Sequence, residues 1–160
     1  MSNWIEITED LSATDPVYQK FYDIQKMMND YYETNLTPEG FYIVNQNKHG
    51  LRAFVYDDGI VECTVCICWK YSDILKLQTT AVGKYDTLSN AVSIAQSKMK
   101  ELMIEYGVTS IYALWATENY PAGQEYYSLY SSRNESIKNG FSDAVTELVR
   151  PDTYKTVWYL

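Results

Sequence analysis

The fold of this chain is decided by the stretch Asp73-Ile-Leu-Lys-Leu-Gln-Thr-Thr-Ala-Val82, followed by the loop Gly83-Lys-Tyr-Asp-Thr87 and by the segment Leu88 to Tyr106. The first stretch is a strand-like run. The last one repeats apolar side chains with a period close to 3.6 residues, which is typical of an amphipathic helix. Thr87 or Ser89 has a side-chain oxygen that can cap this helix. The sequence therefore predicts a strand, a short loop and a helix.

The segments downstream extend this order. Gly107 can take the left-handed conformation and therefore ends the helix. Val108 to Trp115 is apolar enough for a central strand, and a strand reached through a helix usually lies parallel to its predecessor. The rest of the chain is predicted to hold a weakly helical region, Ala122 to Lys138, and two closing strands, Asp143 to Val149 and Tyr154 to Leu160.

The segments upstream predict a helix and an antiparallel meander. Asp15-Pro16 is a favourable helix start, because Asp accepts hydrogen bonds from exposed N–H groups and Pro has no N–H to leave unpaired. The predicted helix runs from Pro16 to Tyr32, with a stripe of Val17, Phe21, Ile24, Met28 and Tyr31. The predicted strands are Trp4 to Thr8, Phe41 to Asn45, Leu51 to Tyr56 and Ile60 to Lys70, with a hairpin turn at Asp57-Asp58-Gly59.

These elements predict one α+β domain over residues 1–160. Its sheet is expected to be mixed and mostly antiparallel, with about six or seven strands and packed helices. A chain of 160 residues with 46% hydrophobic content can bury one real core and is too short for two domains.

The charge balance limits the partners. The chain has 13 basic and 21 acidic side chains, a net charge of -8, and no run of Lys or Arg. Such a chain repels a phosphate backbone, so no nucleic-acid partner is expected. The longest apolar runs fall far below the roughly 20 residues of a membrane span, and the N-terminus has no signal-like region. We expect a cytoplasmic protein with no membrane contact.

Tyrosine is abundant, with 16 residues against 4 phenylalanines. Tyr tolerates both burial and a wet edge. Two interpretations stay open: a surface that contacts a protein partner or a second copy of the chain, or a core shell in which Tyr replaces Phe.

Neither cysteine nor histidine forms a catalytic or metal-binding pattern. Cys63, Cys66 and Cys68 lie in one predicted strand, where Cys63 points to one face and the other two to the opposite face. One metal ion could not hold all three, so we expect buried, reduced thiols and no metal. The only histidine, His49, lies in a polar loop and is interpreted as a turn residue.

The order of elements, together with Asn134-Glu-Ser-Ile-Lys-Asn-Gly-Phe141, resembles the GNAT acyltransferase superfamily over nearly the whole chain. The resemblance implies that the fourth strand splays from the fifth and pairs with the pantetheine arm of coenzyme A. It also implies that the next helix N-terminus holds the pyrophosphate. Carried over by position, the cofactor-binding residues are Gln78, Thr79, Thr80, Ala81, Val82, Gly83, Thr87, Ser89 and Asn90. Tyr127 or Tyr130 takes the place of the tyrosine that protonates the leaving thiolate.

The pyrophosphate loop departs from the family pattern. Members usually carry Arg or Gln followed by Gly-x-Gly or Gly-x-Ala, whereas this loop offers Gly83, Lys84 and an aspartate, Asp86, whose charge repels phosphate. The leading hypothesis is therefore a non-catalytic, acidic, Tyr-rich module that binds a protein partner or itself and needs no cofactor. Its Asn, Tyr, Ile and Lys usage is typical of AT-rich or viral genomes. The alternative is an acetyl-CoA-dependent N-acyltransferase with an atypical loop.

Overall fold

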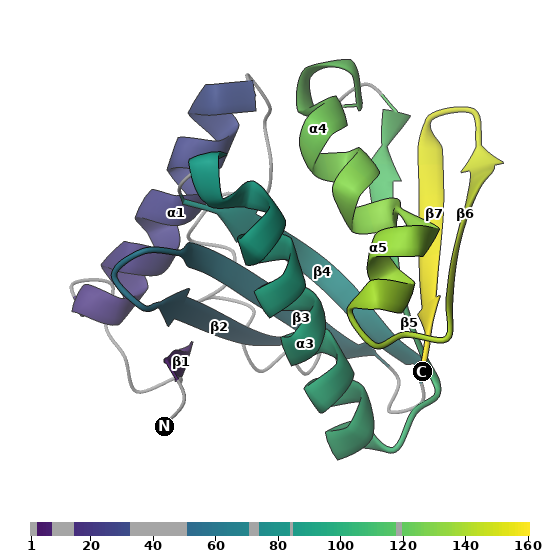
Figure 1. The fold of residues 1–160 in the computed structure, drawn as a ribbon, viewed down its shortest axis with the longest axis horizontal. Coiled ribbons are helices and arrows are strands. Elements are labelled where there is room, and N and C mark those ends of the chain that lie inside the picture. The colour runs from purple at the N-terminus through teal and green to yellow at the C-terminus, as the bar shows by residue number, and fades with distance from the viewer. Residues whose placement is uncertain (1–2, 8–14, 33–50, 71–73, 84, 118–119) are drawn as a thin grey trace.

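A computed structural model describes residues 3–7, 15–32, 51–70, 74–83, 85–117 and 120–160 (Figure 1). The strands of this part form one sheet in the order β1-β2-β3-β4-β5-β7-β6. The strands are β1 (Trp4–Ile7), β2 (Leu51–Asp57), β3 (Glu62–Lys70), β4 (Ile74–Val82), β5 (Ser110–Ala116), β6 (Asp143–Arg150) and β7 (Thr153–Tyr159). The helices are α1 (Pro16–Tyr32), α3 (Leu88–Tyr106), α4 (Tyr120–Ser131) and α5 (Arg133–Lys138), with a 3-10 turn, η1 (Tyr85–Thr87), before α3.

The sheet is mixed and mostly antiparallel, as predicted. Every neighbouring pair is antiparallel except β4 and β5, which are parallel. This exception follows from the crossover through α3, because a helix between two strands carries the chain back to the same edge. The fold class is therefore confirmed as α+β. The strand predicted at Phe41 to Asn45 and the residue His49 lie outside the described residues.

Helices cover both faces of the sheet. Thr64 pairs with Ala81 and Val65 with Thr80, so the side chains of Thr64 and Thr80 lie on opposite faces. Gln25 of α1 donates to the hydroxyl of Thr64 at 3.3 Å, whereas Tyr126 of α4 bonds to Thr80. Hence α1 lies on one face, and α4, with α3 beside it, lies on the other (Figure 1).

The predicted helical stripes form the core. Phe21, Ile24 and Met28 of α1 are at most 1% exposed. The stripe of α3 is also buried, comprising Leu88, Ala91, Val92, Ala95, Met99, Leu102 and Met103. The stripe prediction is confirmed at these positions, while the side chain of Tyr31 is outside the described part.

Turn chemistry explains where several elements begin and end. Gly107 has φ 68 at the end of α3, and its N–H bonds to Ile104, as the predicted left-handed stop requires. In the hairpin, Asp58 Oδ1 accepts from the N–H groups of Ile60 and Val61 at 2.8 and 2.7 Å. Ile60 is therefore part of the turn, and the strand predicted from Ile60 begins at Glu62.

Other boundaries differ from the predictions by one or two residues or by an interruption. The central strand starts at Ser110 because Val108 still donates to Met103 O and completes the helix end. The last two strands are shifted to Asp143–Arg150 and Thr153–Tyr159. The weakly helical region is two helices, because Ser132 is extended and accepts from Glu135 N to cap α5.

The three cysteine side chains are buried and free of disulfides. Burial raises the pKa of Cys63 to about 12 and raises that of Cys66 as well, so these thiols stay protonated near neutral pH. Within the described residues, no group of three or more His, Cys, Asp or Glu could hold a metal ion. The described helices include none that is long and apolar enough to cross a membrane.

Candidate functional site

The parallel strands β4 and β5 separate along their length. They pair at one position, Lys76 with Tyr112, whereas β4 pairs with β3 from Ile74 to Val82. Figure 1 shows the two strands close together near one end and apart at the other. The main chain of β4 beyond Lys76 therefore has no β5 ladder beside it.

Side chains of α4 lie where the two strands separate. Tyr126 Oη donates to the main-chain oxygen of Thr80 at 2.7 Å and also bonds to the Thr80 hydroxyl. The ring of Tyr130 packs on that of Tyr126, with centroids 4.9 Å apart. Both residues are buried, at 4% and 5% exposure. We call Thr80, Tyr126 and Tyr130 the hydroxyl cluster.

The main chain of α4 is hydrogen-bonded to side chains of two other elements, α3 and β7. The carbonyl of Tyr130 accepts from Gln96 Nε2 of α3 at 3.1 Å and from Trp158 Nε1 of β7 at 3.2 Å. These two bonds hold the Tyr130 turn of α4 against the sheet. The side chain of Tyr130 is less well satisfied, because its Oη makes no hydrogen bond.

The two predicted catalytic tyrosines are thus in different places. Tyr130 lies in the hydroxyl cluster, where burial raises its pKa and the nearby hydroxyls of Thr80 and Tyr126 act in the opposite direction. Tyr127 stacks on Trp115 of β5, with centroids 4.9 Å apart and planes 7° apart, and burial raises its pKa to about 12. Their catalytic roles stay predictions.

Tyr126 was missed in the sequence analysis. Residues four apart lie on one face of a helix, so Tyr126 and Tyr130 belong together while Tyr127 points elsewhere. This spacing was visible in the sequence. The hydrogen bond to Thr80 was not, because it joins residues 46 positions apart.

The predicted cofactor residues of β4 lie in a row along the separating strand. Ala81 and Val82 are fully buried, and Thr80 is 7% exposed. Thr79 faces Cys66 in the ladder, next to a bulge in the pairing with β3. Their predicted role in cofactor binding stays a prediction.

Gly83 has a structural reason to be glycine. Its N–H donates to Glu62 O at 2.8 Å, and an added Cβ would lie 2.9 Å from the Cβ of Glu62. The carboxylate of Glu62 is held by Lys20 of α1. The N–H of Gly83 is therefore already used by the sheet, and an acidic side chain lies next to it.

The start of α3 also differs from the expectation. Thr87 occupies the N-cap position with φ -110 and ψ 17, and its side chain makes no capping hydrogen bond. A capping side chain normally belongs to a residue with extended backbone, which ψ 17 is not. Ser89 and Asn90 are exposed in the first turn of the helix. The predicted cap at Thr87 or Ser89 is therefore wrong for Thr87, and Ser89 lies inside the helix.

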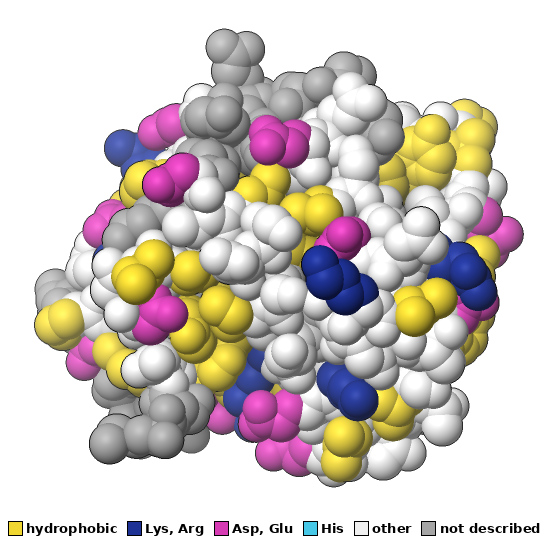
Figure 2. Space-filling model, in the orientation of Figure 1, with side chains coloured by type: hydrophobic (Ala, Val, Ile, Leu, Met, Phe, Trp, Pro, Cys, Tyr) yellow, Lys and Arg dark blue, Asp and Glu magenta, His cyan; other side chains and the backbone are white. Residues whose placement is uncertain are grey.

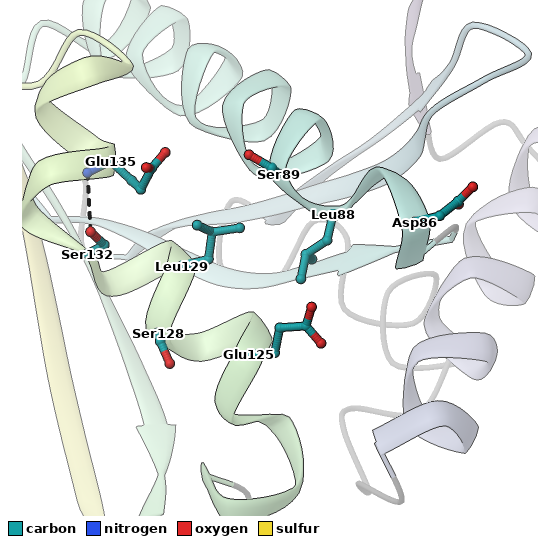
Figure 3. A pocket seen from close by; sticks show the side chains of 8 residues that line it. All are labelled: Asp86, Leu88, Ser89, Glu125, Ser128, Leu129, Ser132 and Glu135. Carbon is teal, nitrogen blue, oxygen red and sulfur yellow. Dashed lines mark hydrogen bonds between the residues drawn. The ribbon is translucent and has the colours of Figure 1, made fainter.

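A groove of about 520 Å³ lies between the start of α3 and α4 (Figure 3). Leu88 and Leu129 face one another across it, and carboxylates from Asp86, Glu125 and Glu135 line it. Its other lining residues are Ser89, Ser128 and Ser132. Carboxylates around a helix N-terminus repel an incoming anion and so weaken the attraction that the positive end of the helix dipole would exert on it. Basic side chains on this face of the molecule are scattered and form no single patch (Figure 2).

A second groove of about 660 Å³ lies on strands β5, β6 and β7. Tyr112 and Leu114 of β5 point to the face opposite Trp115 and α4. Lys155 lies over the ring of Tyr112, 5.0 Å from its centroid. Val149 and Tyr159 in its lining are 42% and 41% exposed. This groove therefore combines apolar side chains with basic ones from Arg150 and Lys155.

Solved structures match this arrangement, although no family model and no curated protein matches the chain. The PaiA N-acetyltransferase of Thermoplasma acidophilum, solved with coenzyme A, has a TM-score of 0.61 and 12% identity, and 100% of both chains is covered. The N-acetyltransferase PseH of Campylobacter jejuni has a TM-score of 0.57 and 9% identity, with 98% of each chain covered. The ribosomal-protein-S18-alanine N-acetyltransferase of Escherichia coli has a TM-score of 0.53 and 17% identity, covering 96% of this chain and 92% of its own.

Identities this low speak for the fold alone. The match extends over the separated strands β4 and β5 and the helices around them. The resemblance inferred from the order of elements is thus confirmed at the level of the fold: this chain has the GNAT fold.

Proposed function

We propose that this protein is a GNAT-type N-acyltransferase that uses an acyl thioester such as acetyl-CoA. The observation that carries the proposal is the separation of β4 from β5 after the single pair Lys76 and Tyr112. A sheet gains nothing in stability from an interrupted ladder, so the separation offers a place beside β4 for a ligand that pairs as a strand does. Neighbours of the same fold include enzymes solved with coenzyme A and with acetyl coenzyme A.

The residues of this chain fit the arm of such a cofactor better than its phosphates. The β4 main chain from Gln78 to Val82 would align an extended arm, and the unpartnered Tyr130 Oη lies at the same place. The phosphates would meet the groove that Asp86, Glu125 and Glu135 line, which we call the acidic groove, and the N–H of Gly83, which already donates to Glu62 O. We therefore place the binding energy in the arm.

Bound acetyl-CoA would supply an activated acetyl thioester to an attacking amine. Main-chain N–H groups of β4 would stabilise negative charge that develops on the carbonyl oxygen. Tyr130 would donate the proton that the leaving sulfur needs, because burial keeps its hydroxyl protonated. Tyr127 is the second candidate for this donation.

Two measurements test the proposal. A ligand that binds the native state alone raises the melting temperature, so acetyl-CoA should give a concentration-dependent shift. Acetyl transfer should release free thiol when a panel of primary amines is added, namely peptide N-termini, lysine, amino sugars and polyamines. No shift at millimolar acetyl-CoA and no thiol release with any amine would reject the enzyme.

A non-catalytic binding module is the second candidate, favoured by the acidic groove and by the groove on β5, β6 and β7. The occupant would be a protein partner or a second copy of the chain, and the experiment is the concentration dependence of the sedimentation coefficient. A location in the cytoplasm and a viral source stay predictions. The organisation of residues 1–160 as one domain is likewise a proposal, supported by the single sheet of the described residues.

A further inference from the structure

The carbonyl oxygen of Thr80 lies on the part of β4 that β5 has left. A strand carbonyl at such a point is unpaired unless another group reaches it, and an unpaired buried carbonyl is costly. Here the phenol of Tyr126 takes the place of the missing strand, at 2.7 Å from the carbonyl oxygen. One side chain thus closes the position that a strand-like ligand would occupy.

Tyr126 reaches this position from a helix rather than from the sheet. Its ring packs edge-on against Tyr127, at 5.3 Å between centroids, and against Tyr130. The helix ends at Ser131, and Ser132 is extended before α5 begins. The hydrogen bonds from Tyr126 to Thr80 are made by a side chain, whose rotation would break them without breaking any strand pair.

The cluster also holds a donor that has no partner. Tyr130 Oη is buried and makes no hydrogen bond, although Thr80 and Tyr126 hydroxyls lie near it. A buried hydroxyl without a partner normally costs stability, so its retention calls for a ligand or another group that pairs with it. Next to it lies an acceptor, the Thr80 carbonyl. A donor beside an acceptor is the pattern that an extended chain with two amides satisfies, with the N–H of one amide and the C=O of the other.

We propose that Tyr126 is a latch on β4, which holds the Thr80 carbonyl until the amide-containing arm of an acyl-pantetheine replaces it. In the exchange, the N–H of one amide of the arm takes over the Thr80 oxygen, and the oxygen of its other amide accepts from Tyr130. Tyr127, the second candidate named above, then donates the proton to the leaving sulfur. The latch rests on the acyltransferase function proposed above and adds a positioning residue to it. It also assigns the affinity to the arm, which carries no phosphate into the acidic groove.

The test uses the full chain and S-acetylpantetheine, which has the arm without the nucleotide. Tyr126→Phe keeps the ring and removes the hydroxyl, so the Thr80 carbonyl loses the hydrogen bond with which the ligand would compete. We expect it to bind S-acetylpantetheine about fivefold more tightly than the wild type by calorimetry, as the loss of one competing hydrogen bond predicts. The matched control is Tyr56→Phe, which removes a tyrosine hydroxyl bonded to Asp58 far from the cluster and should leave the affinity unchanged.

The outcomes separate the latch from the enzyme. If the wild type binds acetyl-CoA and transfers acetyl groups while Tyr126→Phe binds the arm no more tightly, the latch is wrong and the acyltransferase stands. If neither protein binds either thioester, both proposals fall. Tighter binding by Tyr126→Phe and by Tyr56→Phe alike would also overturn the latch, because the effect would not be specific to the cluster.

A measurement on the wild type does not depend on whether the variant folds. Nitration by tetranitromethane, mapped by mass spectrometry, reports the access of reagent to each tyrosine. Saturating S-acetylpantetheine should increase nitration of Tyr126 severalfold, because the arm displaces this side chain from β4. Tyr130 should stay protected, because the arm covers it. Unchanged or reduced nitration of Tyr126 with the ligand bound would contradict the latch.

Discussion

The two sides of β4 differ in what holds them. Toward β3, β4 pairs from Ile74 to Val82, and α1 packs across the back through fully buried side chains such as Phe21. Toward β5, it pairs once, and tyrosines of α4 fill the separation. The first side is held by a ladder that runs along the strand with one bulge and by a buried apolar core, the second by individual side-chain hydrogen bonds. A strand can thus be part of a continuous sheet on one edge and be held by side chains of a helix on the other.

The largest effect should come from breaking the core on the β3 side. Phe21→Ala removes a fully buried ring and should lower the free energy of unfolding by about 3–5 kcal/mol. Urea denaturation followed by circular dichroism measures it. The control is Leu148→Ala in β6, where the side chain is 56% exposed and the change should be below about 0.5 kcal/mol. Similar losses in both variants would contradict the difference between the two regions.

A smaller effect is expected where β4 meets the loop before α3. Gly83→Ala places a Cβ 2.9 Å from Glu62 Cβ and 3.3 Å from Ile24, so the strand must shift, at about 1–3 kcal/mol. Ser89→Ala, in the exposed first turn of α3, serves as the control. The same urea titration decides, and a Gly83→Ala protein as stable as the wild type would mean that this contact is loose.

On the α4 side, the dependence of the free energy of unfolding on alkaline pH tests the burial of Tyr127. Burial raises the pKa of Tyr127 from the usual 10.0 to about 12, so the unfolded chain releases this proton first. Stability is therefore full below pH 10 and falls as the pH rises toward 12. For Tyr127 alone the loss is about 1 kcal/mol, allowing for its partial exposure. Urea midpoints between pH 8 and 12 should fall less steeply for Tyr127→Phe, and an identical slope would refute the assignment.

The smallest effect concerns the acidic groove. Asp86→Asn removes one exposed charge near the start of α3, so acetyl-CoA should bind about two- to threefold more tightly at low salt. S-acetylpantetheine, which lacks phosphates, is the matched ligand and should bind Asp86→Asn and wild type equally. Calorimetry in low and high salt measures both. An equal gain for both ligands would show that the charge acts on something other than phosphate.

Local patterns in the sequence were sufficient for most of the fold. The stripe from Phe21 to Met28 and that of α3 are buried because helical periodicity alone determines which side chains share a face. Gly107 ends α3 because few other residues tolerate φ 68. The order of elements was enough to indicate the GNAT fold. The boundaries at Glu62 and Ser132 could not be predicted, because the hydrogen bonds of Asp58 and Glu135 that set them compete with regular structure.

The candidate site was predicted only in part. The sequence by itself determined strand β4 and the tyrosine-rich segment after it, since both follow from local pattern and chain order. That β4 separates from β5 was implied by the GNAT resemblance. Tertiary structure alone decided that Tyr126 holds Thr80, that Tyr130 Oη has no partner and that the N–H of Gly83 is bound to Glu62. Each of these depends on contacts between residues about 20 to 50 positions apart, and helix or strand periodicity carries no information about such pairs.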